Sequence, residues 1–302
     1  LKRSVVERGE LYLKDYLLKF PDAWQFDVND VIDNGIKAFS RNHREFFNII
    51  KKGVVFSIHG IKDFLSFIPW WLFILIIALI GCRVSRKKHV GILYGAMLFF
   101  IGSAGLWDHM LQTLSIIIAS VVLSVLLGFP IGILLALKKD AERIVRPILD
   151  LMQTMPTFVY LIPAVMLFGV GITPALMATT IYAIVPMIRL TSHGIDQVDK
   201  EVLEAATAFG STTLQTLVKV QIPQALPTIM TGVNQTIMMA MSMVVTCAII
   251  GAEGLGMEIL VATNRTEMGK ALMPGISIVF IAVILDRITQ GLVGDRERMP
   301  NE

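Results

Sequence analysis

The feature that most constrains this chain is the length of its segments without a charged side chain. An α-helix needs about 20 apolar residues to cross the roughly 30 Å hydrocarbon core of a bilayer, where it satisfies its own backbone hydrogen bonds. Segments free of Asp, Glu, Lys and Arg occur at Phe64–Cys82, Val90–Trp107, Met110–Leu137, Leu151–Ile188, Val220–Ala252 and Ala271–Leu285. Hydrophobic residues make up 54% of the chain and charged residues 17%, against about 25% charged residues in a soluble domain. We therefore expect an all-α, polytopic membrane protein and not a soluble enzyme.

The segment Leu151–Ile188 is too long for one helix. Its centre, Gly169–Pro174, combines two glycines with a proline, which interrupts a helix. We therefore divide the segment into a hairpin of two short spans, which brings the expected total to about seven transmembrane helices. The last uncharged segment is short, so we expect its helix to continue past Asp286 and Arg287 to the level of the lipid headgroups.

Basic residues predict the orientation of these spans. The short loop after the first span carries four basic residues and no acidic one: Arg83, Arg86, Lys87 and Lys88. Such loops stay in the cytoplasm, which places the N-terminus outside and the C-terminus in the cytoplasm. Lys51, Lys52 and Lys62 lie near the first span and favour the opposite orientation, but we give more weight to the compact loop.

The chain divides into three parts by this pattern. Residues 1–65 are mixed in character, and apolar residues recur at helical spacing from Val28 onward, so we expect an N-terminal amphipathic extension lying at the membrane interface. A tail that only packs on the helical bundle remains the alternative. Residues 66–292 form the transmembrane domain, and residues 293–302 form a cytoplasmic tail.

This sequence lacks the residues that several kinds of chemistry require. The GxxxxGK[ST] phosphate loop of an ATPase is missing, and Met268–Ala271, the nearest string, lacks the upstream glycine and the hydroxyl. The five histidines match no zinc spacing, and Cys82 and Cys247 form no CxxC pair. We therefore predict no catalytic residues, no metal site and no cofactor in this chain. A net charge of +3, spread along the chain, gives no reason to expect nucleic acid as a partner.

The longest internal loop, residues 190–223, contains a helix-turn-helix pattern. Val198–Phe209 is rich in helix-forming residues, Gly210 can end that helix, and Ser211 can cap a second helix that runs toward Pro223. This pattern predicts a protruding pair of helices that another protein could approach. A simple connector is equally consistent with the composition.

Seven positions in this loop resemble a known motif. They are Glu204, Ala205, Ala206, Gly210, Val220, Ile222 and Pro223. Their residue types and spacing resemble the EAA motif of bacterial ABC importer permeases, with two conservative departures at Val220 and Ile222. The resemblance implies a coupling helix that docks on a separate ATPase subunit, present in two copies, which binds ATP and magnesium.

Further strings narrow the resemblance. They are Asp150–Pro163, Pro227–Thr236, Met241–Val245 and Ile284–Gln290. Together they resemble the permease subunit of bacterial glycine betaine/proline importers, which take up quaternary-ammonium osmoprotectants, over roughly residues 65–292. The resemblance implies a type I ABC importer (MetI-like) fold, a bacterial inner-membrane location and a homodimer. Because the sequence stops at Glu302, soon after the last span, we expect a separate extracytoplasmic substrate-binding protein.

The sixth span combines methionines with uncharged polar residues. The candidate residues of a translocation path are Asn234, Gln235, Met238, Met241, Ser242 and Thr246. Flexible methionine and uncharged polar groups suit the passage of a weakly held zwitterion, although helix packing is the more common reason for such residues. Gly251, Gly254 and Gly256 follow this span and mark a candidate outer gate.

Prolines and glycines within or beside the spans are candidate bends. They are Gly128, Pro130, Gly132, Pro156, Pro163, Pro186, Pro223 and Pro227. Such broken helices also suit an ion-coupled secondary carrier or an osmotically gated channel for small zwitterions. The EAA spacing favours the importer, because a carrier has no need of a cytoplasmic docking loop.

Overall fold

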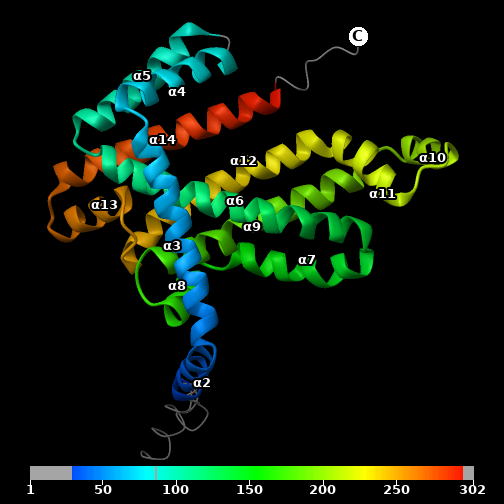
Figure 1. Ribbon diagram of the computed structural model, residues 1–302, viewed down its shortest axis with the longest axis horizontal. Helices are drawn as coiled ribbons and strands as arrows, with labels where there is room; N and C mark the ends of the chain where they lie inside the picture. The colour runs from blue at the N-terminus through cyan, green and yellow to red at the C-terminus, as the bar shows by residue number, and fades with distance from the viewer. Residues whose placement is uncertain (1–28, 86, 295–302) are drawn as a thin grey trace, which may run out of the picture. The chain divides into compact units, whose positions relative to one another are not determined.

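The structure, a computed structural model, describes residues 29–85 and 87–294, which form helices joined by short turns (Figure 1). No strand occurs in these ranges. The chain separates into two compact units, residues 1–44 and 45–302. The described part of the first unit is α2 (Asn29–Asn42), whose apolar residues recur at helical spacing, as the sequence predicts. All further elements belong to the second unit.

Four long helices form the centre of the second unit. They are α6 (Trp107–Leu137), α9 (Ile172–Asp196), α12 (Ile222–Thr246) and α14 (Met268–Gly294). They run side by side in Figure 1, where α9 packs against both α6 and α12, and α12 packs against α14. Each lies in a helical segment long and apolar enough to cross a membrane. The all-α, polytopic architecture expected from the sequence is therefore confirmed.

Small residues allow these helices to approach closely. A Cβ atom on Gly132 of α6 would lie 2.6 Å from the Cβ of Thr191 and 2.8 Å from the carbonyl oxygen of Ile188, both in α9. On Gly194 of α9 it would lie 3.0 Å from Thr228 of α12. Close backbone packing holds helices together in lipid, where the hydrophobic effect between them is weak. Gly132, predicted as part of a bend, is thus a contact position within the continuous helix α6.

The first predicted span begins later than the sequence suggested. Helix α3 (Arg44–Phe67) ends before Pro69, and α4 (Trp70–Ser85) starts at an angle of 92° to it. Phe64, taken as the start of the span, therefore belongs to α3. Helix α5 (Lys88–Ser103) packs on α4, where Gly81 faces the ring of Tyr94.

Pro156 breaks the fourth predicted span. The charged residues before Leu151 form α7 together with the start of the predicted span (Lys139–Thr154), and α8 (Thr157–Phe168) leaves it at 101°. A helix of 12 residues extends only about 18 Å, so α8 alone cannot cross a bilayer. The expected short span from Leu151 is therefore not one continuous helix, and whether the bent pair crosses the membrane stays a prediction.

The predicted reversal of the chain after α8 is confirmed, although α9, with 25 residues, is not a short span. Helix α8 ends at Phe168 and α9 begins at Ile172, and the glycines between them, Gly169 and Gly171, have φ values of 81° and 115°. Residues other than glycine rarely adopt such values. The two glycines thus allow the sharp reversal of the chain.

A further helix was not predicted. After the short 3-10 turn η3 (Cys247–Ile250), α13 (Leu255–Asn264) forms where the sequence indicated only a turn. Within the described residues, four helical segments are long and apolar enough to span a membrane, or up to six if each bent pair counts as one span. The shorter apolar helix α5 stands outside that number, so the expected total of about seven stays a prediction.

The principal cluster of buried apolar residues joins helices from early and late parts of the second unit. It includes Ile101 of α5, Met110 of α6, Leu176 of α9 and Met241 of α12. Ile58 of α3 is fully buried in the same cluster. The second half of the predicted N-terminal extension therefore packs into the core of the transmembrane unit.

Candidate functional site

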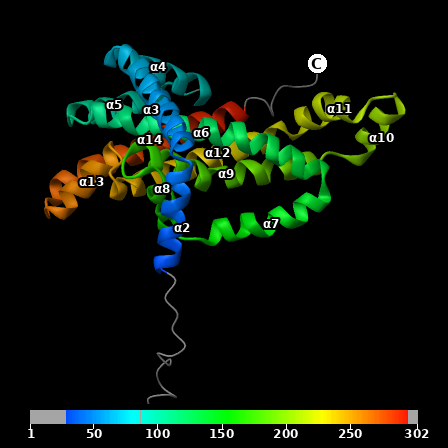
Figure 2. The same ribbon diagram turned by 60° about the horizontal axis from the view of Figure 1, so that its bottom comes forward.

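The 190–223 loop forms a protrusion at the ends of α9 and α12. Helix α10 (Lys200–Ala208) is followed by α11 (Thr213–Thr216) and the π-helical turn η2 (Leu217–Gln221), which leads into α12. In both views α10 and α11 lie beyond the ends of the long helices (Figures 1 and 2). The predicted helix, turn and helix are confirmed.

Local hydrogen bonds fix the shape of α10. The Asp199 carboxylate accepts a hydrogen bond of 2.9 Å from the Glu201 N–H at the start of the helix. At its end, Gly210 has φ of 81°, its N–H donates to the Thr207 carbonyl at 2.9 Å, and the Ser211 N–H donates to the Ala206 carbonyl at 3.1 Å. This is the glycine-terminated cap that satisfies the last carbonyls of a helix. The spacing between the alanines and Gly210 is therefore a geometric requirement of the turn.

The second cap differs from the prediction by one residue. Thr212, and not Ser211, caps α11: the Thr212 hydroxyl accepts from the Gln215 N–H at 3.3 Å, and the Gln215 side chain accepts from the Thr212 N–H at 2.9 Å. The Ser211 hydroxyl instead donates to the Ala206 carbonyl at 2.7 Å and lies 2.7 Å from the Thr216 hydroxyl. Ser211 is thus occupied in tying α10 to α11.

The remaining motif positions form the junction with α12. The Ile222 N–H donates to the carbonyl of Leu217, five residues earlier, so the chain makes a wide π turn there. Val220 and Ile222 are half-buried, and Pro223 is exposed in the first turn of α12, where its missing N–H costs no hydrogen bond. Leu217, buried against Ile195 and Ile229, anchors the junction on the long helices.

Several apolar side chains of the protrusion are exposed. Phe209 is 93% exposed, Leu214 68% and Val218 54%. Glu204 and Ala205 are also exposed, and Ala206 is half-buried. We call the residues Glu204, Ala205, Phe209, Leu214 and Val218 the docking surface. Several exposed apolar residues within one short segment are typical of an interaction site.

The sequence motif alone did not identify Phe209, Leu214 and Val218 as functional residues. The sequence could have indicated these residues, because each is an apolar residue in a polar loop and Phe209 directly precedes Gly210. Only the structure shows that these side chains are not needed for the packing of their own chain, since the buried residue of this segment is Leu217.

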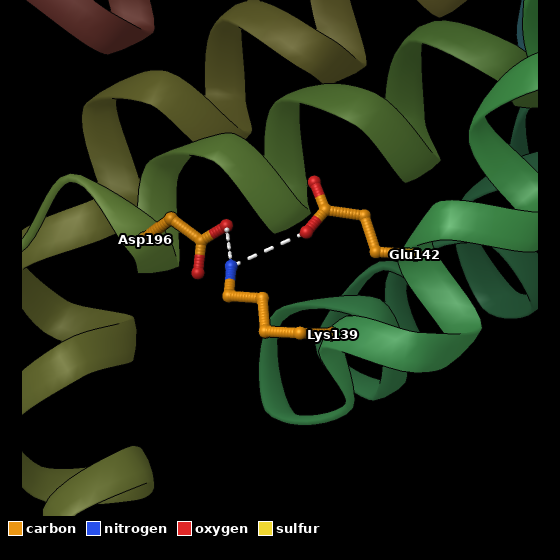
Figure 3. A network of polar contacts seen from close by, with 3 residues as sticks. All are labelled: Lys139, Glu142 and Asp196. Carbon is orange, nitrogen blue, oxygen red and sulfur yellow. Dashed lines mark hydrogen bonds and ion pairs between the residues drawn. The ribbon is translucent and has the colours of Figure 1, made fainter.

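Ion pairs attach α7 to the end of α9, just before the protrusion. The Lys139 ammonium lies 2.6 Å from Asp196 of α9 and 3.3 Å from Glu142 of α7 (Figure 3). Lys139 begins a helix in a stretch that the sequence assigns to the cytoplasm, and its hydrogen bond with Asp196 raises the pKa of the ammonium above the ordinary lysine value. A second ion pair joins Arg189 of α9 to Asp150 of α7.

The structure separates the six candidate path residues into two groups. Gln235, Met238 and Ser242 are exposed on one stripe of α12, and half-buried Thr246 donates to the Ser242 carbonyl at 3.2 Å. The remaining pair lies elsewhere.

Asn234 and Met241 face the interior of the unit. The Asn234 amide donates to Asp286 of α14 at 3.2 Å and accepts a hydrogen bond from the Thr289 hydroxyl. Met241 is 5% exposed in the principal buried cluster. These two residues therefore pack helices, which was the alternative reading of the span.

The three glycines of the candidate outer gate hold α13 in place. Gly251 has φ of 82° and Gly254 has φ of 128°, and a Cβ atom on Gly254 would lie 2.5 Å from the Thr113 hydroxyl of α6. The Leu255 N–H donates to that hydroxyl at 2.9 Å. Gly256 is buried in α13 against Val245. Among the residues described, no group of three or more His, Cys, Asp or Glu could hold a metal ion.

Comparison with known proteins gives a consistent family. The model of the family described as "Binding-protein-dependent transport system inner membrane component" matches residues 128–296. The glycine betaine transport system permease protein OpuAB of Bacillus subtilis is 44% identical over 87% of this chain and 93% of its own length. The glycine betaine/proline betaine permease ProW of Escherichia coli is 40% identical over 93% of this chain and 77% of its own length.

Solved structures support the fold. An inward-facing form of the MetNI methionine ABC transporter matches with a TM-score of 0.54 at 20% identity, over 61% of this chain and 92% of that chain. An amino acid ABC transporter matches with a TM-score of 0.52 at 22% identity, over 68% of this chain and 95% of that chain. The MetI-like fold implied by the EAA motif is therefore confirmed. The chain belongs to the family of binding-protein-dependent transport system inner membrane components, the permeases of ABC transporters.

Proposed function

We propose that this chain is the membrane-spanning subunit of an ATP-driven importer for a compatible solute such as glycine betaine or proline. The observation that carries the proposal is the EAA-type protrusion with its exposed apolar docking surface. The solutes for which the relatives are named, glycine betaine and proline betaine, support a small zwitterion with a quaternary ammonium group as the substrate.

The docking surface contacts a separate ATPase subunit, which binds ATP and Mg²⁺ in place of this chain. Phe209 and Leu214 enter an apolar groove of that partner, and Glu204, Ala205 and Ala206 allow a close approach of α10. Gly210, Val220, Ile222 and Pro223 keep the protrusion in a fixed relation to α12. Motion of the ATPase thereby reaches the membrane helices through a short and rigid connection.

Two copies of the chain form the transport unit, because one chain offers one protrusion and the ATPase acts as a pair. The exposed stripe of Gln235, Met238 and Ser242, with Thr246 at its end, faces the second copy and lines the path. Uncharged polar groups and methionine suit a solute without net charge. Asn234 and Met241 support this stripe from behind and do not contact the solute.

The chain lies in the bacterial inner membrane, with its N-terminus outside and its C-terminus in the cytoplasm. With α4 crossing the bilayer, the 92° bend places α3 nearly in the membrane plane. Phe56, which is 81% exposed, and Phe67, which is 86% exposed, then enter the lipid interface. Gly251, Gly254 and Gly256 lie at the outer face, where a separate binding protein delivers the solute.

Reconstitution into liposomes tests the proposal. Uptake of radiolabelled glycine betaine is expected only when ATP, the ATPase subunit and the binding protein are all present. Uptake driven by an ion gradient without ATP would favour the alternative, an ion-coupled carrier, and passive flux after osmotic shock would favour a channel.

A pair of matched variants tests the docking surface itself. Phe209→Ser is expected to abolish co-purification of the ATPase and ATP-driven uptake, while expression and membrane insertion persist. Phe67→Ser removes an equally exposed phenylalanine at a distant place and is expected to leave the ATPase bound. Ala206→Glu and Gly210→Pro should act as Phe209→Ser does, and ATPase binding that survives all three changes would refute the docking role.

A further inference from the structure

A polar pocket of about 220 Å³ lies between α7 and α9, away from both the docking surface and the exposed stripe of α12. Its polar lining consists of Glu142 and Arg146 from α7 and Arg189, Ser192, His193 and Asp196 from α9. Leucines complete the wall, and no Phe, Tyr or Trp side chain lines it. We call this the α7–α9 pocket. The proposed function uses none of these residues.

The acidic groups of the pocket already have a cation. Both Glu142 and Asp196 pair with the Lys139 ammonium, at 3.3 Å and 2.6 Å (Figure 3). Their side chains are 24% and 28% exposed. A bound cation would have to compete with Lys139 for both carboxylates, so the pocket offers little to a metal ion or an ammonium group.

Several donor groups of the pocket, by contrast, lack an acceptor. Arg189 pairs with Asp150 through one terminal nitrogen, but its Nε is buried without a hydrogen-bond partner. Ser192 is 6% exposed, and its hydroxyl is also buried without a partner. Arg146 forms no ion pair with any residue in the described ranges. Unpartnered buried donors cost free energy, which an arriving acceptor would recover.

A ligand that supplies acceptors and no donors completes this arrangement. We propose that the α7–α9 pocket binds a phosphate oxyanion, held by Arg146, Arg189 and Ser192. Arginine is suited to this role, because its planar guanidinium presents several N–H donors to the oxygens of one phosphate. A quaternary ammonium is a poor candidate, since such groups are recognised by aromatic rings. The phosphate can come from a phospholipid headgroup or from free phosphate in solution.

Two measurements on the full-length chain, purified without the ATPase, distinguish these sources. Titration calorimetry with inorganic phosphate in phosphate-free detergent at constant ionic strength detects a site for the free anion. Native mass spectrometry counts the phospholipid molecules that the chain retains after delipidation. We expect saturable phosphate binding, one retained phospholipid, or both, and the result identifies the source.

Matched variants decide whether the pocket is responsible. Arg146→Gln is expected to weaken phosphate binding by about tenfold or more, or to release the retained lipid, as the loss of a charge-assisted hydrogen bond implies. Ser192→Ala should weaken binding less, and Arg146→Lys should restore part of it. Arg143→Gln is the control, because Arg143 lies on the same helix, pairs with exposed Asp140 and does not line the pocket.

Three results would overturn the proposal. The chain could bind neither phosphate nor phospholipid, Arg146→Gln could bind both as tightly as the unmodified chain, or Arg143→Gln could lose as much as Arg146→Gln. None of these measurements requires transport or the ATPase. A result that overturns the phosphate site would therefore leave the proposed import function unaffected.

Discussion

The seam between α6 and α9 and the protrusion between α9 and α12 are stabilised by opposite means. In the seam, Gly132 lets two backbones approach until a single added methyl group would collide with Thr191. In the protrusion, nothing lies within 4 Å of a Cβ placed on Gly210, and the shape depends on caps and turns. Steric fit thus controls the membrane helices, and local backbone geometry controls the docking surface. Substitutions in the two regions should therefore fail for different reasons.

The largest effect is expected in the seam. Gly132→Ala should lower the free energy of unfolding by about 1–3 kcal/mol, because the added methyl overpacks the contact between α6 and α9. Thermal unfolding of the purified chain in detergent measures this. Gly275→Ala in α14 is the matched control, since nothing lies within 4 Å of its Cβ position, and it should not destabilise the chain. Equal melting temperatures for the two variants would contradict the steric account.

The next effect concerns Gly210. Its φ of 81° costs any residue with a Cβ about 1–2 kcal/mol, roughly 5- to 30-fold in the population of the native turn. Gly210→Ala should therefore weaken ATPase binding, measured by titration of the purified subunit, without lowering the melting temperature of the membrane helices. Gly210→Asn should retain more binding, because asparagine tolerates this conformation. The reverse order of Ala and Asn would show that space, and not backbone geometry, matters here.

A smaller effect is expected at the cap of α11. Thr212→Val removes the hydroxyl that accepts from the Gln215 N–H, at a cost of about 1 kcal/mol. Amide hydrogen exchange should accelerate by roughly fivefold in residues 213–217 and remain unchanged in α9. Thr213→Val, one residue further on, alters no cap and provides the comparison. Unchanged exchange in Thr212→Val would mean that docking on the long helices alone holds α11.

The smallest effect is expected at the Lys139 ion pairs. Lys139 is 59% exposed, and exposed pairs contribute about 0.2–1 kcal/mol, less in high salt. Lys139→Met should lower the melting temperature slightly in low salt and not measurably in high salt. Because Asp196 raises the pKa of Lys139, the contribution should persist through neutral pH and disappear as the pH rises through that pKa. A salt-independent loss would indicate packing by the lysine stem instead.

Positions with special backbone requirements were predictable from the sequence. Gly169, Gly171 and Gly210 all have positive φ values, and each marks a chain reversal that the sequence placed correctly. The EAA spacing was likewise informative, because the glycine-terminated cap fixes the separation between Ala206 and Gly210. Residues close together in the sequence determine these features, so the sequence alone is enough to predict them.

Features that depend on the packing of distant segments were not predictable. Pro156 was a candidate bend, but the sequence could not show that the helices on its two sides meet at 101°. Nor could it show which side of α12 faces α14. Asn234 was assigned to the path because it is polar, whereas its partner, Asp286, lies in a helix much later in the sequence.

The π turn between Leu217 and Ile222 explains part of this difficulty. It holds one residue more than an α turn, and each residue of an α-helix advances the side chains by about 100°. A helical wheel drawn continuously from Leu214 to Ser242 is therefore out of phase by that angle beyond the turn. Deletion of one residue from 219–221 would re-phase the two segments and turn α11, with Leu214, about the axis of α12 without changing any residue of α10 or α11.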